Sequence, residues 1–132
     1  MTLALVTPIR LLAFLPSLFW LALTAITVLS LIPSAVVPDP LQFWDKAQHT
    51  LAFALLTVLG GLSYPRHLKV VVLSLLIYGG LIELAQANLT TTRFGDVIDW
   101  VADAIGIAAG TALHAVWLYK LSPQAVPPDR QP

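Results

Sequence analysis

The sequence predicts an all-α, polytopic membrane protein with four transmembrane helices in a small bundle. Hydrophobic residues make up 58% of the 132 residues and charged residues only 11%, whereas about a quarter of a typical soluble domain is charged. So few charges cannot cover a surface for water, and we therefore expect lipid to surround the chain. The apolar residues also gather in four long runs, without the alternation that marks a half-buried strand.

The four runs are expected to cross the membrane at about residues 11–32, 46–64, 68–87 and 97–119. The first run has no charged residue between Leu11 and Ile32 and is long enough for about 30 Å of hydrocarbon. A cleaved signal peptide is the alternative, but the run exceeds the usual apolar core of about 7–15 residues, and Pro33 suits a cleavage site poorly. We therefore expect a retained helix.

Prolines and short polar loops separate the later runs. Residues 65–67, which read P-R-H, form a tight connection between the second and third runs, and a threonine-rich loop at 88–95 precedes the fourth. Residues 1–121 are therefore expected to form one four-helix domain. Residues 122–132 are proline-rich and polar, which predicts a disordered cytoplasmic tail.

The charges in the loops predict the orientation. With four spans, the N-terminus, the loop at 65–69 and the C-terminal tail share one side of the membrane. That side holds five of the seven basic residues, namely Arg10, Arg66, Lys69, Lys120 and Arg130. Because cytoplasmic loops carry an excess of lysine and arginine, both termini are expected in the cytoplasm.

This topology brings polar residues from three runs to one membrane level, at the outer face. They are Asp45, Lys46, His49, Glu83, Gln86, Arg93, Asp96, Asp99 and Asp103. An acid near the centre of a membrane helix costs about 2.5–3.5 kcal/mol on insertion scales, and such acids usually mark a substrate, ion or proton site. The alternative is that they pair with Lys46 and Arg93 and only join the helices. Five acids against two bases leave three negative charges unbalanced, which favours a functional site.

Three of these residues are candidates for catalysis: His49, Glu83 and Asp99. A histidine can act as a general base when a carboxylate fixes its tautomer, and Asp45, Glu83 or Asp99 could do so here. A metal site built from His49, Glu83 and Asp99 is an alternative, but no metal-binding spacing is diagnostic, so we predict no metal and name no cofactor. The candidates for binding are Asp45, Lys46, Gln86, Arg93, Asp96 and Asp103.

The fourth run carries one continuous stripe, because Asp96, Asp99, Asp103, Gly106 and Gly110 share a helix face. Asp103 lies about 10 Å deeper than Asp96, at roughly 1.5 Å per residue. The two glycines form a small-xxx-small pair, which predicts close packing against a neighbouring helix.

Three blocks of the sequence together resemble the VanZ-like membrane protein family. They are DKAQHTLAF from Asp45, GGLIELAQ from Gly79 and RFGDVIDWVADAIGIAAG from Arg93, and the resemblance covers about Pro38 to Ala115. The family pattern maps onto Asp45, Lys46, His49, Phe53, Glu83, Gln86, Arg93, Asp96, Asp99, Gly106 and Gly110. Asp103 departs from it, since the family usually has asparagine there.

The resemblance implies a small, multi-pass protein of the bacterial cytoplasmic (inner) membrane that acts in the cell envelope. The family is named for a protein that confers teicoplanin resistance, a form of glycopeptide resistance, and no biochemical activity is settled for the family as a whole.

Three functions fit these residues. The first is an enzyme that acts on an envelope lipid or lipid-linked precursor, with His49 as base or nucleophile and with Lys46 and Arg93 holding a phosphate or carboxylate. The second is a module that binds a lipid head group, glycopeptide, proton or cation, and the third is a structural protein whose polar cluster only locks the helices. The net charge of zero argues against a nucleic-acid partner, and the absence of cysteine excludes thiol chemistry. Oligomerisation stays open.

Overall fold

The computed structural model describes residues 13–32, 42–91 and 94–121, and all of its regular elements are helices. These are α2 (Leu15–Leu31), α3 (Gln42–Ser63), the short 3-10 helix η2 (Pro65–His67), α4 (Leu68–Leu89) and α5 (Val97–Leu121). The prediction of an all-α fold is confirmed. The predicted tail at 122–132 and the basic residues Arg10, Arg93 and Arg130 lie outside the described residues.

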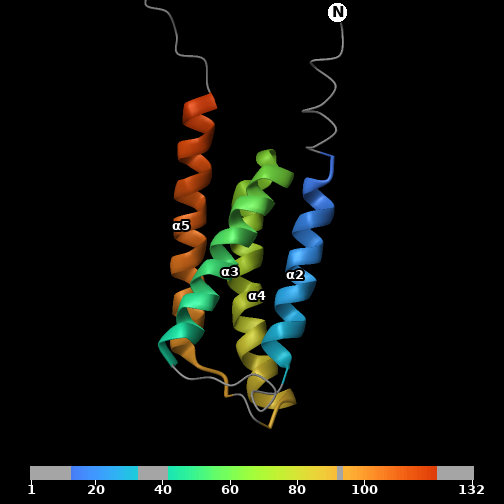
Figure 1. Ribbon diagram of the computed structural model, residues 1–132, viewed down its shortest axis with the longest axis vertical. Coiled ribbons are helices and arrows are strands. Elements are labelled where there is room, and N and C mark those ends of the chain that lie inside the picture. Colours follow the sequence, from blue (N-terminus) through green and yellow to red (C-terminus); the bar gives the residue numbers. More distant parts are fainter. Residues whose placement is uncertain (1–12, 33–41, 92–93, 122–132) are drawn as a thin grey trace, which may run out of the picture.

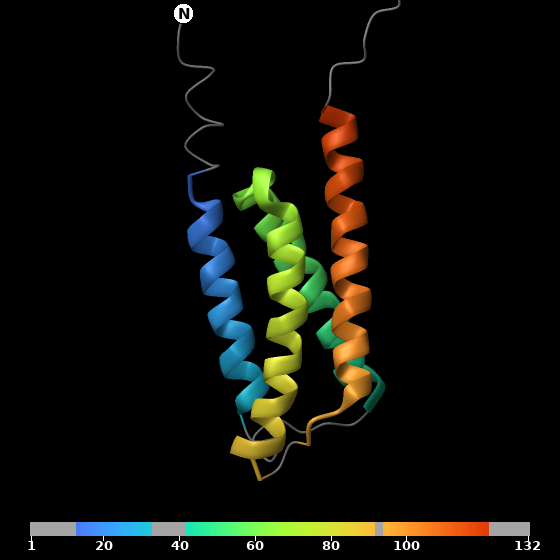
Figure 2. The ribbon, with the colours of Figure 1, turned by 180° about the vertical axis from the view of Figure 1, so that it is seen from behind.

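The four long helices run alternately up and down in a bundle (Figure 1). The end of α2, the start of α3, the end of α4 and the start of α5 all lie at the bottom of that view, which we call the lower end. The opposite view confirms this arrangement (Figure 2). Residues that are distant in the sequence, at the start of α3, the end of α4 and the start of α5, therefore meet at one end of the molecule.

Two helical segments, not four, are long and apolar enough to cross a membrane within the described ranges. They are Pro65–Leu89 and Val97–Lys120, with mean hydropathies of 2.0 and 1.5. α2 is apolar but has only 17 described residues, and the run predicted for it begins at residue 11, outside them. α3 has 22 residues, but Asp45, Lys46 and His49 near its start lower its hydropathy.

The apolar surface of the bundle faces outward. Only 28% and 33% of the two most apolar windows are buried inside the bundle, unlike the core helix of a soluble protein. Each of the four long helices exposes large aliphatic side chains, for example Leu21, Leu51, Leu73 and Ile105. Exposed apolar area of this extent is rare on soluble monomers.

α3 and α5 form the most extensive interface of the bundle, and glycines make it close. A Cβ atom on Gly110 would lie 2.6 Å from the carbonyl oxygen of Ala54 and 2.7 Å from the Cβ of Thr57. A Cβ atom on Gly106 would meet the carbonyl oxygen of Thr50. The prediction of close packing at this glycine pair is confirmed, and the helix that carries Asp99 and Asp103 is thereby held against the helix that carries His49.

Candidate functional site

Most of the predicted site residues come together at the lower end, on α3, on α4 and at the start of α5. Asp96 precedes α5, and its Oδ1 accepts a hydrogen bond of 2.8 Å from the backbone N–H of Ile98, as an N-terminal capping residue does. This hydrogen bond, followed by that from Lys46, lowers the pKa of Asp96 below its ordinary value. Its own backbone N–H donates to Oε2 of Glu83 at 2.7 Å, which joins α4 to the start of α5.

His49 and Asp103 form a buried pair between α3 and α5. Nδ1 of His49 lies 2.8 Å from Oδ1 of Asp103, and the two side chains are 8% and 0% exposed. The expected partners were Asp45, Glu83 or Asp99, so this partner corrects the sequence-based prediction. The reason is the close α3–α5 packing, together with Gly79 on α4, where a Cβ atom would lie only 2.6 Å from Oδ2 of Asp103.

Lys46 forms ion pairs with two carboxylates of the polar cluster at the lower end. Its Nζ lies 2.7 Å from Oδ1 of Asp99 and 3.1 Å from Oδ2 of Asp96. The side chain of Lys46 is 37% exposed and that of Asp99 is 9% exposed. This ion pair fits the structural alternative considered above, but it balances only part of the charge of the cluster.

Two buried carboxylates keep an oxygen without a hydrogen-bond partner among the residues that the structure describes. These atoms are Oε1 of Glu83 and Oδ2 of Asp103, and the two residues are 8% and 0% exposed. An unsatisfied buried polar atom costs about 1–3 kcal/mol, and more when it is charged. Such atoms are therefore expected to meet a proton, a cation or a ligand.

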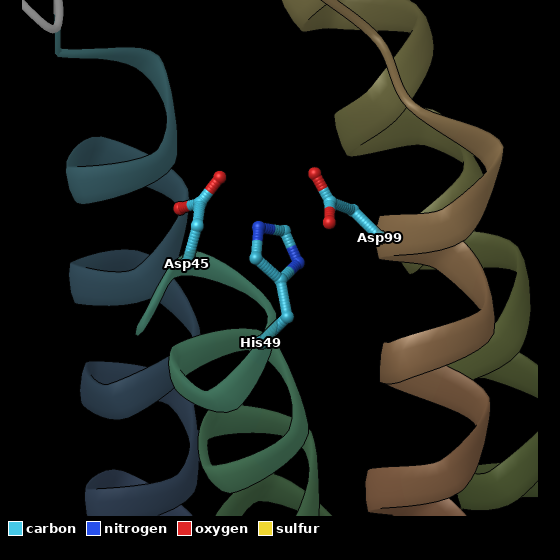
Figure 3. A group of neighbouring side chains, drawn as sticks. All are labelled: Asp45, His49 and Asp99. Atoms are coloured by element: carbon cyan, nitrogen blue, oxygen red, sulfur yellow. The ribbon is translucent and has the colours of Figure 1, made fainter. Parts of the chain in front are cut away.

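The imidazole of His49 lies between the carboxyl groups of Asp45 and Asp99, and the three side chains point toward one another (Figure 3). One ligand atom from each of these residues lies within 4.8 Å of the other two. The same is true of a second, overlapping group formed by His49, Glu83 and Asp103. His49 is therefore the centre of the cluster, and either group could hold a metal ion.

A cavity of about 120 Å³ adjoins His49 between α2 and α3. One part of its wall is polar and the other is apolar. The polar residues are Ser30, Asp45, Gln48 and His49, and the apolar ones are Ile26, Leu29, Ala52 and Phe53. Ser30 and Gln48 were not predicted as site residues, and a single serine in an apolar run such as Ser30 is not a signal for a site.

One predicted site residue, Gln86, forms its hydrogen bond outside the cluster. Gln86 is buried, but its side-chain amide donates to the carbonyl oxygen of Ser30 at 3.0 Å, so it joins α4 to α2. Arg93 lies outside the described residues.

No family model matches the chain, and neither a curated protein nor a solved structure was found to match it.

We expect Lys46→Met to lower the free energy of unfolding in detergent by about 1–3 kcal/mol, because the nearly buried Asp99 then loses a hydrogen bond between charged groups. The measurement is unfolding followed by circular dichroism. Lys69→Met is the matched control, since Lys69 is exposed at the other end of the bundle and should change little. In the double variant Lys46→Met/Asp99→Asn, part of the loss should be recovered, whereas strictly additive effects would contradict the role given to this ion pair.

Proposed function

We propose that the chain is a four-span, VanZ-like protein of the bacterial inner membrane, with both termini in the cytoplasm and the lower end of the bundle at the outer face. The exposed aliphatic side chains on all four long helices support the membrane environment. The charge distribution of the described residues supports the orientation, because Arg66, Lys69 and Lys120 lie toward the end opposite the lower end and the described acids lie toward the lower end.

The protein binds the head group of an envelope lipid or lipid-linked precursor beside His49 and acts on it. The observation that carries this proposal is the divided wall of the cavity between α2 and α3. A lipid has the same division, with a polar head group that suits Asp45, Gln48 and His49, and an apolar chain that suits Ile26 and Leu29. Pockets that combine a mostly apolar wall with a few convergent polar groups are the usual form of small-molecule sites.

His49 is the central group of this site. When Oδ1 of Asp103 accepts the hydrogen bond from the Nδ1–H of His49, the lone pair of the ring is on Nε2. A lone pair held in this way can accept a proton or bind a metal ion. Asp103 is thus the carboxylate that fixes the tautomer of His49, a role for which other carboxylates were expected.

The proposal is tested by mass spectrometry of the lipids that copurify with the full-length protein. We expect a defined head-group class with the wild type, and its loss from His49→Ala and Glu83→Gln when both variants accumulate in the membrane. His67→Ala is the matched control, because His67 is exposed at the other end of the bundle. The same lipids in equal amounts from wild type and His49→Ala would overturn the proposal.

The alternative is a lipid- or ion-binding module or a structural module without bond chemistry, and the ion pairs of Lys46 favour the structural role. The two functions differ in the fate of the bound lipid. Incubation of the copurified lipid with wild-type protein changes its mass if the protein is an enzyme and leaves it unchanged if the protein only binds. Loss of stability without any change in bound lipid would assign the cluster a structural role alone.

A further inference from the structure

We infer that the lower end of the bundle holds one divalent metal ion, bound by Nε2 of His49 and by the carboxylates of Asp45 and Asp99. These three residues offer ligand atoms within 4.8 Å of one another, and their side chains converge (Figure 3). Atoms bound to one tetrahedral zinc ion are about 3.4 Å apart, given bond lengths near 2.1 Å.

The pairing of His49 with Asp103 favours a metal ion on the other ring nitrogen. Histidines that bind metals almost always donate their second ring N–H to a carboxylate, a carbonyl or water, which fixes the tautomer and makes the ligating nitrogen more basic. Here the 2.8 Å contact between Nδ1 and Oδ1 of Asp103 occupies one nitrogen. Nε2 is the other ring nitrogen, and we therefore assign it to the ion.

Asp99 keeps an oxygen atom for the ion, and the carboxylate of Glu83 lies beside the site. Lys46 binds Oδ1 of Asp99, so Oδ2 is the atom that Asp99 would offer. Glu83 is 8% exposed, its Oε1 has no partner in the described part of the chain, and one of its carboxylate oxygens lies within 4.8 Å of His49 and Asp103. A buried carboxylate atom without a partner, on a residue beside the site, indicates a positively charged occupant.

The excess of negative charge in the cluster also indicates a bound cation. Five carboxylates, those of Asp45, Glu83, Asp96, Asp99 and Asp103, gather near a single lysine in the described ranges. Buried charges without partners are strongly destabilising. A divalent ion offsets two of these charges at the point where three helices meet.

The types of donor atom indicate which metal ions would bind. One imidazole nitrogen with carboxylate oxygens suits Zn²⁺, Mn²⁺ or Fe²⁺, whereas Mg²⁺ and Ca²⁺ prefer oxygen alone. Three protein ligands leave a coordination position open, as in catalytic rather than structural zinc sites. That an oxygen of the lipid head group fills this position rests on the proposed function, but binding of the ion does not.

The test uses full-length protein in detergent that has been stripped with a chelator and then titrated with Zn²⁺, with calorimetry and elemental analysis as readouts. We expect one Zn²⁺ per chain, and at least a tenfold loss of affinity in His49→Ala and in Asp45→Asn. His67→Ala should bind as the wild type does. Equal stoichiometry and affinity in the wild type and His49→Ala would overturn the inference.

A second measurement avoids variants that fail to fold. Wild-type protein loaded with Mn²⁺ should show coupling of the electron spin to an imidazole nitrogen in pulsed electron paramagnetic resonance, and absence of this coupling would also overturn the inference. Different results would contradict the metal site and the proposed function. Metal binding without copurified lipid contradicts only the proposed function, and lipid retained by protein that binds no metal contradicts only the metal site.

Discussion

Gly106→Ala is expected to lower the free energy of unfolding by about 1–3 kcal/mol, the range for an overpacked site. The added methyl group would meet the backbone carbonyl of Thr50, with the carbonyl carbon at 3.0 Å and the backbone nitrogen of Ala54 at 3.1 Å. Backbone atoms of a helix cannot rotate away as a side chain can. α3 and α5 would have to move apart, and His49 would then move away from Asp103. Thermal unfolding in detergent measures the loss of stability.

Gly80→Ala is the matched control for this prediction. It makes the same chemical change within α4, but the nearest atoms to the added Cβ belong to the side chain of Trp100, at 3.7 and 3.9 Å. These are ordinary contacts, and alanine has the higher helix propensity by about 1 kcal/mol in soluble helices. We therefore expect Gly80→Ala to be neutral or slightly stabilising. If both variants lose stability equally, close α3–α5 packing is not the reason for the loss.

Asp103→Leu is expected to weaken Zn²⁺ binding about 10–100-fold, the effect of removing a carboxylate that orients a metal-binding histidine. Leucine branches at the same atom as aspartate but cannot accept the hydrogen bond from Nδ1 of His49, which is 2.8 Å long in the wild type. The ring is then free to rotate and to carry its proton on Nε2. Calorimetry measures the affinity.

Asp103→Asn separates the effect of the hydrogen bond on Zn²⁺ affinity from the effect of the negative charge. The amide oxygen of asparagine can still accept from Nδ1, so we expect an affinity between those of the wild type and Asp103→Leu. Nitrogen NMR of the histidine ring reports the tautomer even without metal, and it should show the proton on Nδ1 in the wild type and a shift toward Nε2 in Asp103→Leu. A wild-type tautomer and affinity in Asp103→Leu would show that Asp103 does not position His49.

The helices themselves were largely predictable. The runs at 46–64, 68–87 and 97–119 correspond to α3 (Gln42–Ser63), α4 (Leu68–Leu89) and α5 (Val97–Leu121). Long apolar runs bounded by proline and polar loops are local signals, and each of these runs corresponds to one helix. The number of spans was less predictable. Polar residues in the first turns of α3 lower its hydropathy and only 17 residues of α2 are described, so two segments rather than four meet the criterion of length and composition.

The composition of the cluster was predictable for a similar reason. Three short connections force the start of α3, the end of α4 and the start of α5 to one end of any up-and-down bundle, so Lys46, His49, Glu83 and Asp99 had to lie at one level. The glycine pair at Gly106 and Gly110 likewise predicted a close interface, and the structure adds that α3 is the neighbour.

The pairing within the cluster was decided only by the tertiary structure. Asp103 binds His49, Gln86 binds the backbone of Ser30, and the cavity beside His49 is completed by α2. Helix periodicity states which residues share a face, but distances between faces depend on how two helices cross and rotate against each other. That geometry follows from packing at side chains far from the site, including two glycines whose lack of a side chain brings α5 against α3.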